Sequence, residues 1–134
     1  MFFKKQHIEK ALAIKAGPSK IHGTGVFAKA SFSPGAIIEK VPLILLDATE
    51  RSRLQYTPLF DHYFLLDHAQ TPVALALGMA SLYKHAAIPN AAYTILLKKG
   101  LLVVKAIALI NQDEEITINY HGNTGNKNDE ATLY

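Results

Sequence analysis

Residues 19–28 read Ser-Lys-Ile-His-Gly-Thr-Gly-Val-Phe-Ala, and this glycine-rich stretch decides which fold the chain can adopt. It matches the Gly-x-Gly-x-x-Ala form of the dinucleotide-binding fingerprint, which requires an apolar strand before it and a helix after it. Neither is predicted here, because Pro18 precedes the stretch and Ser33-Pro34-Gly35 forms a turn soon after it. The two glycines therefore indicate exposed backbone that a ligand can approach closely, and not a Rossmann fold.

Around this stretch the chain consists of short apolar runs separated by turn residues, a pattern typical of a mainly β domain. The runs of strand length cover residues 11–14, 25–28, 37–45, 63–66, 73–77, 92–97, 101–104 and 116–118. Helix is expected only over residues 47–55, capped by Asp47 or Thr49, and in one short turn over residues 79–83.

Turn residues predict how these runs connect. Residues 98–100, Lys-Lys-Gly, indicate the clearest hairpin, and residues 70–72, Gln-Thr-Pro, indicate a second one. Pro42 predicts a break in the long run, with a bend or an edge position. A spacing also repeats, since Phe32-x-x-Gly35-x-x-Ile38 resembles Ile110-x-x-Asp113-x-x-Ile116. Two similar turns entering strands explain this repeat without a duplication.

Length and composition limit the function classes. The 134 residues fit a single domain, 1–134, with a polar C-terminal tail at residues 123–134. No cysteine is present, which excludes disulfides, thiolate zinc sites and cysteine nucleophiles. No apolar run reaches the length of a membrane span, which is about 18 residues. The expected protein is soluble and intracellular, cytoplasmic or, in a eukaryote, nuclear, with no membrane partner.

Charge and histidine spacing favour neither nucleic acid nor metal as a partner. The net charge is +3, but the lysines are scattered and do not alternate with aromatic residues along one face. A basic β-barrel that binds nucleic acid is therefore the weakest alternative. The chain has six histidines, none of them at the i, i+4 spacing of a helical metal site, so no metal is expected.

Two further stretches contain residues suited to chemistry. Residues 84–91 read Lys-His-Ala-Ala-Ile-Pro-Asn-Ala, and residues 114–120 read Glu-Glu-Ile-Thr-Ile-Asn-Tyr. Taken singly, each has a structural explanation: His85 as a structural histidine, residues 89–90 as a turn, and Tyr120 as a core aromatic residue.

Together with residues 19–28 and the segment 32–39, these stretches resemble, in order and spacing, the motifs of the SET-domain protein-lysine methyltransferases. The similarity covers roughly residues 11–122. It implies a SET fold of small sheets with a knot-like C-terminal substructure, and S-adenosylmethionine as the cofactor. It also implies methyl transfer to a lysine of a protein or peptide substrate.

The resemblance implies roles for particular residues. Tyr120 is the expected catalytic residue, and Tyr93 with Tyr120 would line the substrate channel, where a hydroxyl can limit the number of methyl groups added. Asn90 is expected to order its own loop. The residues expected at the cofactor are His22, Gly23, Thr24, Gly25, Lys84, His85 and Tyr120, with His85 on the adenine side.

The chain departs from the family pattern at several positions. Lys84 stands in place of an asparagine that can accept a hydrogen bond from the cofactor ammonium, whereas lysine only donates. We therefore expect either weak cofactor binding or a Lys84 side chain turned into solvent. Ala86 lacks the usual hydroxyl, and Gly122 stands where many members have an aromatic residue.

Many members close the site with a cysteine-rich zinc segment, which this chain lacks. The tail, through Tyr134, or the partner subunit of a homodimer is expected to close the site instead, and minimal viral SET proteins form homodimers. The alternative function is a SET-like binding module with weak or no catalytic activity.

Overall fold

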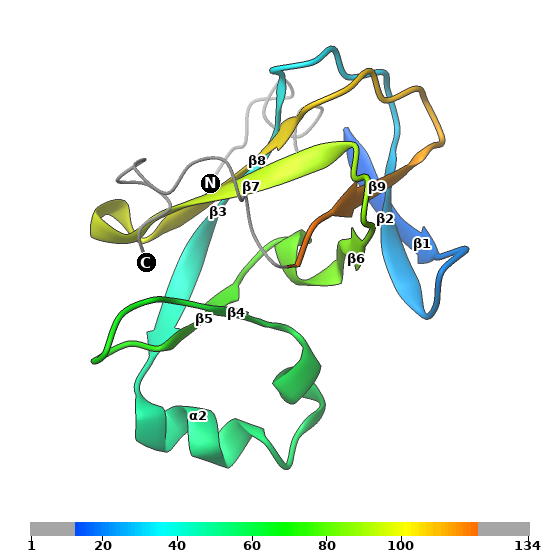
Figure 1. Cartoon of the computed structure of the whole chain (residues 1–134). Coiled ribbons are helices and arrows are strands. Elements are labelled where there is room, and N and C mark those ends of the chain that lie inside the picture. Colours follow the sequence, from blue (N-terminus) through cyan, green and yellow to red (C-terminus); the bar gives the residue numbers. More distant parts are fainter. Residues whose placement is uncertain (1–12, 121–134) are drawn as a thin grey trace, which may run out of the picture.

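The computed structural model of the chain describes residues 13–120, which form two β-sheets with little helix (Figure 1). The mainly β fold class predicted from the sequence is confirmed. Residues 11–12 of the first predicted strand lie outside the described residues, as do Gly122 and the predicted tail with Tyr134.

The smaller sheet joins strands from both ends of the described chain. Its order is β1 (Ile14–Pro18), β2 (Thr24–Ala28), β9 (Glu115–Ile118) and β6 (Lys84–His85). β2 pairs antiparallel with both β1 and β9, whereas β6 runs parallel to β9. This order brings three of the stretches singled out in the sequence into one sheet.

The larger sheet contains the remaining strands. Its order is β4 (Tyr63–Leu65), β5 (Val73–Ala76), β3 (Ile37–Leu46), β8 (Leu101–Ala106) and β7 (Ala91–Leu96). Both predicted hairpins are confirmed, β4 with β5 and β7 with β8. The turn of the second hairpin is η3 (Leu97–Lys99) followed by Gly100, whose φ of 64° suits a glycine.

The predicted break at Pro42 is wrong. β3 continues through Pro42 in the middle of the sheet, where its pairing changes from β8 to β5 and the Pro42 carbonyl accepts a hydrogen bond from Leu77 N (3.0 Å). The first strand, expected over residues 11–14, extends as far as the Gly17-Pro18 pair and pairs these two residues with Gly25 and Thr24. β1 is an edge strand, where a residue without an N–H group is tolerated.

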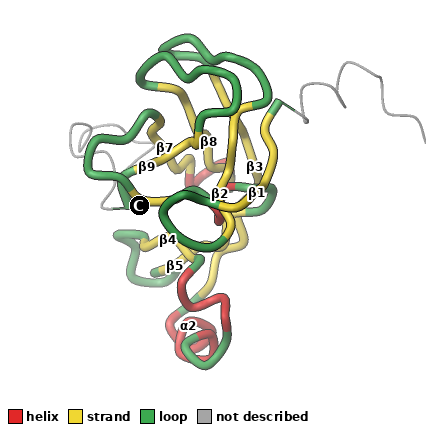
Figure 2. Tube along the Cα trace, turned by 90° about the vertical axis from the view of Figure 1, so that its right-hand side faces the viewer, coloured by secondary structure: helices red, strands yellow, loops and turns green. Residues whose placement is uncertain are grey.

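The α-helix of the described residues lies at one end of the molecule. α2 (Ala48–Leu54) is capped by Asp47 as predicted, through reciprocal hydrogen bonds with Glu50 (2.8 and 3.0 Å). Figures 1 and 2 place α2 beyond the end of β3, away from β1 and β2, and none of its residues is buried. The other short helices are η1 (Pro58–Asp61) and η2 (Ala80–Leu82).

The repeated sequence spacing corresponds to two matching turns. Phe32 and Ile110 bridge each other through two backbone hydrogen bonds of 2.8 and 3.0 Å. Each is followed by a four-residue turn, closed by a backbone hydrogen bond of 3.0 and 3.1 Å respectively. The third residues of these turns, Gly35 and Asp113, have positive φ angles of 88° and 70°. Two similar turns therefore lead the chain into β3 and β9.

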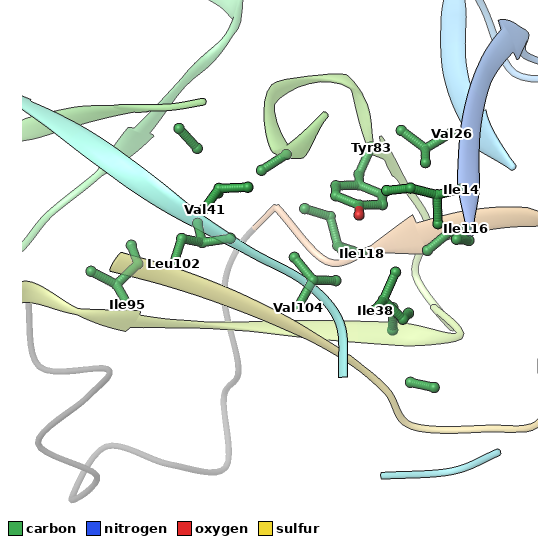
Figure 3. Close-up of a cluster of buried hydrophobic side chains, with 14 of the residues drawn as sticks. Ile14, Val26, Ile38, Val41, Tyr83, Ile95, Leu102, Val104, Ile116 and Ile118 are labelled. Carbon is green, nitrogen blue, oxygen red and sulfur yellow. The ribbon is translucent and has the colours of Figure 1, made fainter. Parts of the chain in front are cut away.

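One cluster of buried side chains joins the two sheets (Figure 3). It combines residues of the smaller sheet with residues of the larger one, among them Ile14, Val26, Ile116 and Ile118, and Val41, Ile95, Leu102 and Val104. Tyr83, just before β6, has the largest fully buried side chain and lies among these aliphatic residues. The core therefore supports β6, which contains Lys84 and His85, and β9, which leads to Tyr120.

Candidate active site

The glycine-rich stretch forms a tight turn between β1 and β2, closed by a hydrogen bond from Ser19 N to Gly23 O (2.8 Å). Gly23 has a φ of 56°, a left-handed conformation that strains other residues. His22 and Thr24 are exposed on either side of it. The turn thus leaves its backbone at Gly23 uncovered by a side chain.

Glu115 on β9 explains why residue 25 is a glycine. A Cβ atom on Gly25 would stand 2.5 Å from Glu115 Oε2 and 3.1 Å from Ser19 Cβ. The Glu115 carboxylate accepts hydrogen bonds from Ser19 Oγ (2.6 Å) and Lys20 N (3.1 Å). Gly25 therefore makes room for a protein carboxylate, which fastens the glycine turn to β9.

The two residues of β6 lie beside β9, in register with Thr117 and Ile118. Lys84 is only 5% exposed, and its Nζ atom lies 3.9 Å from the position that a Cβ of Gly23 would take. Of the two outcomes expected for Lys84, the side chain turned into solvent is therefore wrong. The side chain extends toward the glycine turn instead.

Tyr120 follows β9 and is held by two hydrogen bonds to the chain around β6. Its backbone N–H donates to His85 Nδ1 (3.0 Å), and its hydroxyl donates to the Tyr83 carbonyl (2.6 Å). Accepting that bond requires His85 Nδ1 to be unprotonated. The two rings lie 5.2 Å apart between their centroids. Burial raises the pKa of the Tyr120 hydroxyl, so the group keeps the proton that it donates.

Glu39 of β3 supports this arrangement from inside the molecule. Its carboxylate accepts hydrogen bonds from Tyr83 Oη (3.0 Å) and Met79 N (2.8 Å). Burial raises the pKa of Glu39, while these two bonds act in the opposite direction. Burial, with the nearby Glu39 charge, raises the pKa of Tyr83 far above its ordinary value. Glu39 thus fixes the residue whose carbonyl receives the Tyr120 hydroxyl.

A pocket of about 520 Å³ opens beside Tyr120. Tyr93 lines it too and packs edge-on against Phe64, with ring centroids 5.0 Å apart. Burial raises the pKa of Tyr93. The described residues that line the pocket are Phe60, Asp61, His62, Tyr63, Phe64, Leu65, Ala80, Ser81, Tyr83, Tyr93, Ile118 and Tyr120. They include one carboxylate, Asp61, and no lysine or arginine.

Asn90 ties the loop between β6 and β7 to β9. Its side-chain amide donates to Glu115 O (2.9 Å), and its side-chain oxygen accepts from Thr117 N (2.9 Å). Ala86 N in the same loop donates to Ile118 O (3.0 Å). The prediction that Asn90 orders its loop is consistent with these bonds, which also fasten β9.

The predicted site residues fall into two neighbouring groups. The glycine turn lies with Lys84, while Tyr93 and Tyr120 line the pocket, and His85 is bonded to Tyr120. Sequence reasoning gave no role to Glu39 or to the segment 60–65. Two signals were available: Glu39 is the one acid in the run 37–46, and the segment 60–65 has three aromatic residues.

Between residues 13 and 120, no group of three or more histidine and acidic side chains is arranged to hold a metal ion. No helix within the same residues is long and apolar enough to cross a membrane.

The sequence matches the family model described as the SET domain over residues 23–121. The resemblance predicted from the four stretches is confirmed by this match. Among curated proteins, no significant match to the sequence is found.

Solved structures show a similar arrangement of the chain. One is a candidate histone methyltransferase from Plasmodium falciparum, 28% identical, with a TM-score of 0.62 over 81% of this chain and 92% of that one. Two others are Chaetomium thermophilum polycomb repressive complex 2 structures, one bound to an inhibitor and one, autoinhibited, bound to S-adenosylmethionine. Both are 21% identical, with TM-scores of 0.68 and 0.62, and the match covers 81% of this chain but only 15% of each polycomb chain.

Proposed function

The chain belongs to the SET-domain family, and on that premise we propose that it transfers methyl groups from S-adenosylmethionine to a lysine side chain of a protein or peptide. The family and the similar structures support protein-lysine methyl transfer in general, and S-adenosylmethionine is the cofactor of SET methyltransferases. The observation that carries the proposal is the Tyr120 hydroxyl, which is fixed on a backbone carbonyl at the wall of an aromatic pocket.

The glycine turn and β6 fit the cofactor. Gly23 leaves backbone groups open, and the buried Lys84 side chain extends toward the same turn. We assign cofactor binding to His22, Gly23, Thr24 and Gly25, together with Lys84 and His85. Bound there, S-adenosylmethionine supplies an electrophilic methyl group on a positively charged sulfur.

The aromatic pocket suits a lysine side chain. Ring faces attract a cation, and the Asp61 carboxylate at the pocket adds to that attraction. The amine must lose its proton before it can attack, and desolvation inside the pocket favours the neutral form. The pocket residues thus draw in a charged side chain and then favour its deprotonation.

Tyr120 is the proposed catalytic residue. Because its proton is donated to the Tyr83 carbonyl, the lone pairs of its oxygen are available for weak C–H···O contacts with the methyl group being transferred. Such contacts orient the methyl group and the amine for in-line transfer, which supplies much of the rate enhancement. Tyr93 on the same pocket would limit the number of methyl groups added.

A methyl-transfer assay with labelled cofactor and lysine-rich proteins tests the proposal. We expect Tyr120→Phe to lower the rate by about a hundredfold, as the loss of one positioned polar group does in other enzymes. Tyr56→Phe is the matched control, since Tyr56 is 85% exposed and lies outside the pocket, and it should keep the wild-type rate. In the same assay, Tyr93→Phe should increase the number of methyl groups per lysine, read by mass spectrometry.

The alternative, a SET-like binding module without turnover, makes a different prediction. Wild type, Tyr120→Phe and Tyr56→Phe would then transfer equally little label, although all three bind the cofactor. That result would overturn the proposed enzyme and leave the family assignment intact.

A further inference from the structure

Lys84 differs from every other lysine between residues 13 and 120. The others are all exposed, whereas Lys84 is 5% exposed and is the one charged side chain in the buried class. Its place on β6 is fixed by the parallel register with Thr117 of β9. The sheet therefore fixes the backbone from which the Lys84 side chain extends toward the glycine turn.

The Lys84 ammonium has no protein partner within residues 13–120, where neither a hydrogen bond nor an ion pair to it is found. The carboxylate on the neighbouring strand, Glu115, accepts from Ser19 Oγ and Lys20 N instead. Lys84 Nζ extends toward Gly23, where a missing side chain leaves the backbone open. The largely buried Lys84 side chain thus carries its positive charge to an open stretch of backbone.

Because no described residue supplies a counter-charge to the Lys84 ammonium at this turn, the arrangement favours a ligand that brings an anionic group there. The amino-acid end of the cofactor carries a carboxylate and an ammonium. At hydrogen-bond distance in a partly desolvated site, a unit charge on the ligand is attracted or repelled by the Lys84 ammonium much more strongly than it would be in water. The sign of this interaction decides which of the two groups faces Lys84.

We propose that Lys84 binds the α-carboxylate of S-adenosylmethionine and that the α-ammonium of the cofactor is turned away from it. This inference rests on the proposed function and reverses the expectation that lysine at this position weakens cofactor binding. The family asparagine would accept a hydrogen bond from the cofactor ammonium, whereas the buried lysine donates to its carboxylate. Lys84 therefore determines specificity for a ligand with a free carboxylate.

Equilibrium binding with ligand analogues tests the proposal without requiring turnover. The probes are S-adenosylhomocysteine, its analogue without the α-carboxylate and its analogue without the α-amino group. The proteins are wild type, Lys84→Met, Lys84→Asn and Lys105→Met, which removes an exposed lysine on β8 as a charge control. Wild type and Lys105→Met should lose at least tenfold in affinity when the carboxylate is removed, which is about 1.4 kcal/mol.

Lys84→Met should bind S-adenosylhomocysteine and the analogue without a carboxylate within about threefold of each other, since the two interactions form a double-mutant cycle. Equal carboxylate dependence in wild type and Lys84→Met would overturn the proposal and leave the proposed function standing. A second result would also overturn the proposal: wild type, but not Lys84→Met, binding the analogue without the α-amino group more tightly than S-adenosylhomocysteine. That result would mean that the α-ammonium, and not the carboxylate, faces Lys84. If no adenosyl ligand binds wild type, the inference and the proposed function both fail.

Thermal unfolding without ligand gives a second readout. Because the Lys84 ammonium forms no hydrogen bond or ion pair with the described residues, Lys84→Met removes no stabilising contact and should unfold at the wild-type temperature or above it. A clear fall in Tm for both Lys84→Met and Lys84→Asn, but not for Lys105→Met, would show that Lys84 stabilises the fold and overturn the proposal. The binding of the three analogues to wild type requires no variant, so the dependence on the carboxylate can be measured even if a Lys84 variant fails to fold.

Discussion

Glu39 carries a carboxylate into the interior, where it accepts hydrogen bonds from Tyr83 Oη and Met79 N. Burial raises its pKa above the ordinary glutamate value of 4.5. A raised pKa in the folded state means that the folded protein binds the proton more tightly than the unfolded chain does. The stability associated with Glu39 is therefore greatest at low pH, and it falls as the pH rises from about 4.5 through the folded pKa.

Glu39→Gln makes this dependence measurable. We expect the unfolding free energy of wild type minus that of Glu39→Gln to decrease over this pH window, because only wild type has the carboxyl group whose pKa is raised by burial. Urea unfolding at several pH values between 4 and 8 measures the difference. Glu114→Gln removes an exposed carboxylate and controls for net charge. An identical pH profile for the two variants would contradict the role of burial at Glu39.

The sequence predicted Tyr120 and the glycine turn as site residues, but it did not predict that Lys84 and Glu39 are withdrawn from solvent. The four motifs identified Tyr120 and the glycine turn because their residue types and order are distinctive. Burial of Lys84 depends on β6 pairing with β9, and burial of Glu39 depends on Tyr83 packing into the core. Both partners lie more than 30 residues away in the chain, so an isolated charge in the sequence resembles a solvated one.

Among the elements, the turns after β5 and before β8 contain glycines with nearly the same backbone. Gly78 has a φ of 63° and Gly100 a φ of 64°, so alanine at either position should lose about 1–2 kcal/mol of stability from the left-handed conformation. A Cβ at Gly78 would also stand 2.6 Å from Glu39 Oε2 and 2.6 Å from Val41 Cγ1. At Gly100 nothing lies within 4 Å of that position.

We therefore expect Gly78→Ala to lower the unfolding free energy by roughly 1–3 kcal/mol more than Gly100→Ala does, because only Gly78→Ala adds overpacking to the backbone cost. Urea denaturation of the two variants measures this difference directly. Equal losses would mean that Glu39 and Val41 move aside freely, which would contradict the close packing of this turn.

The distance along the chain between interacting residues also explains which elements the sequence predicts. Both hairpins and the capped helix α2 depend on residues close together in the chain, and they form as predicted. The extension of β1 to Pro18 depends on its pairing with β2, and the path of β3 through Pro42 depends on β5 and β8. The break expected at Pro42 was wrong for this reason, because Pro42 alone does not indicate the strands beside it. β6 has only two residues and owes its existence to β9, so no local pattern indicates it.

For the molecule as a whole, the site is assembled around β9 from segments distant in the sequence. β9 pairs with β2 near one end of the described chain and with β6 from its middle, and Asn90 bonds to its backbone at Glu115 and Thr117. Contacts between distant segments must overcome a larger loop-closure entropy before they contribute to stability. We therefore expect β9 to join the fold after the local hairpins have formed.

Asn90→Ala tests this order of assembly. The substitution leaves the Glu115 carbonyl and the Thr117 N–H without their Asn90 partners, which should cost about 2–4 kcal/mol in total. If β9 joins late, the Asn90 contacts are absent from the folding transition state, so their loss changes mainly the unfolding rate. Stopped-flow kinetics should then show the unfolding rate rising at least tenfold while the folding rate changes less than threefold. Asn111→Ala is the matched control, because Asn111 is exposed and its side-chain amide donates only to the Glu114 carboxylate (2.7 Å). A folding rate that falls as steeply as stability would instead place the Asn90 contacts in the transition state, and Tyr120 would then be positioned early in folding.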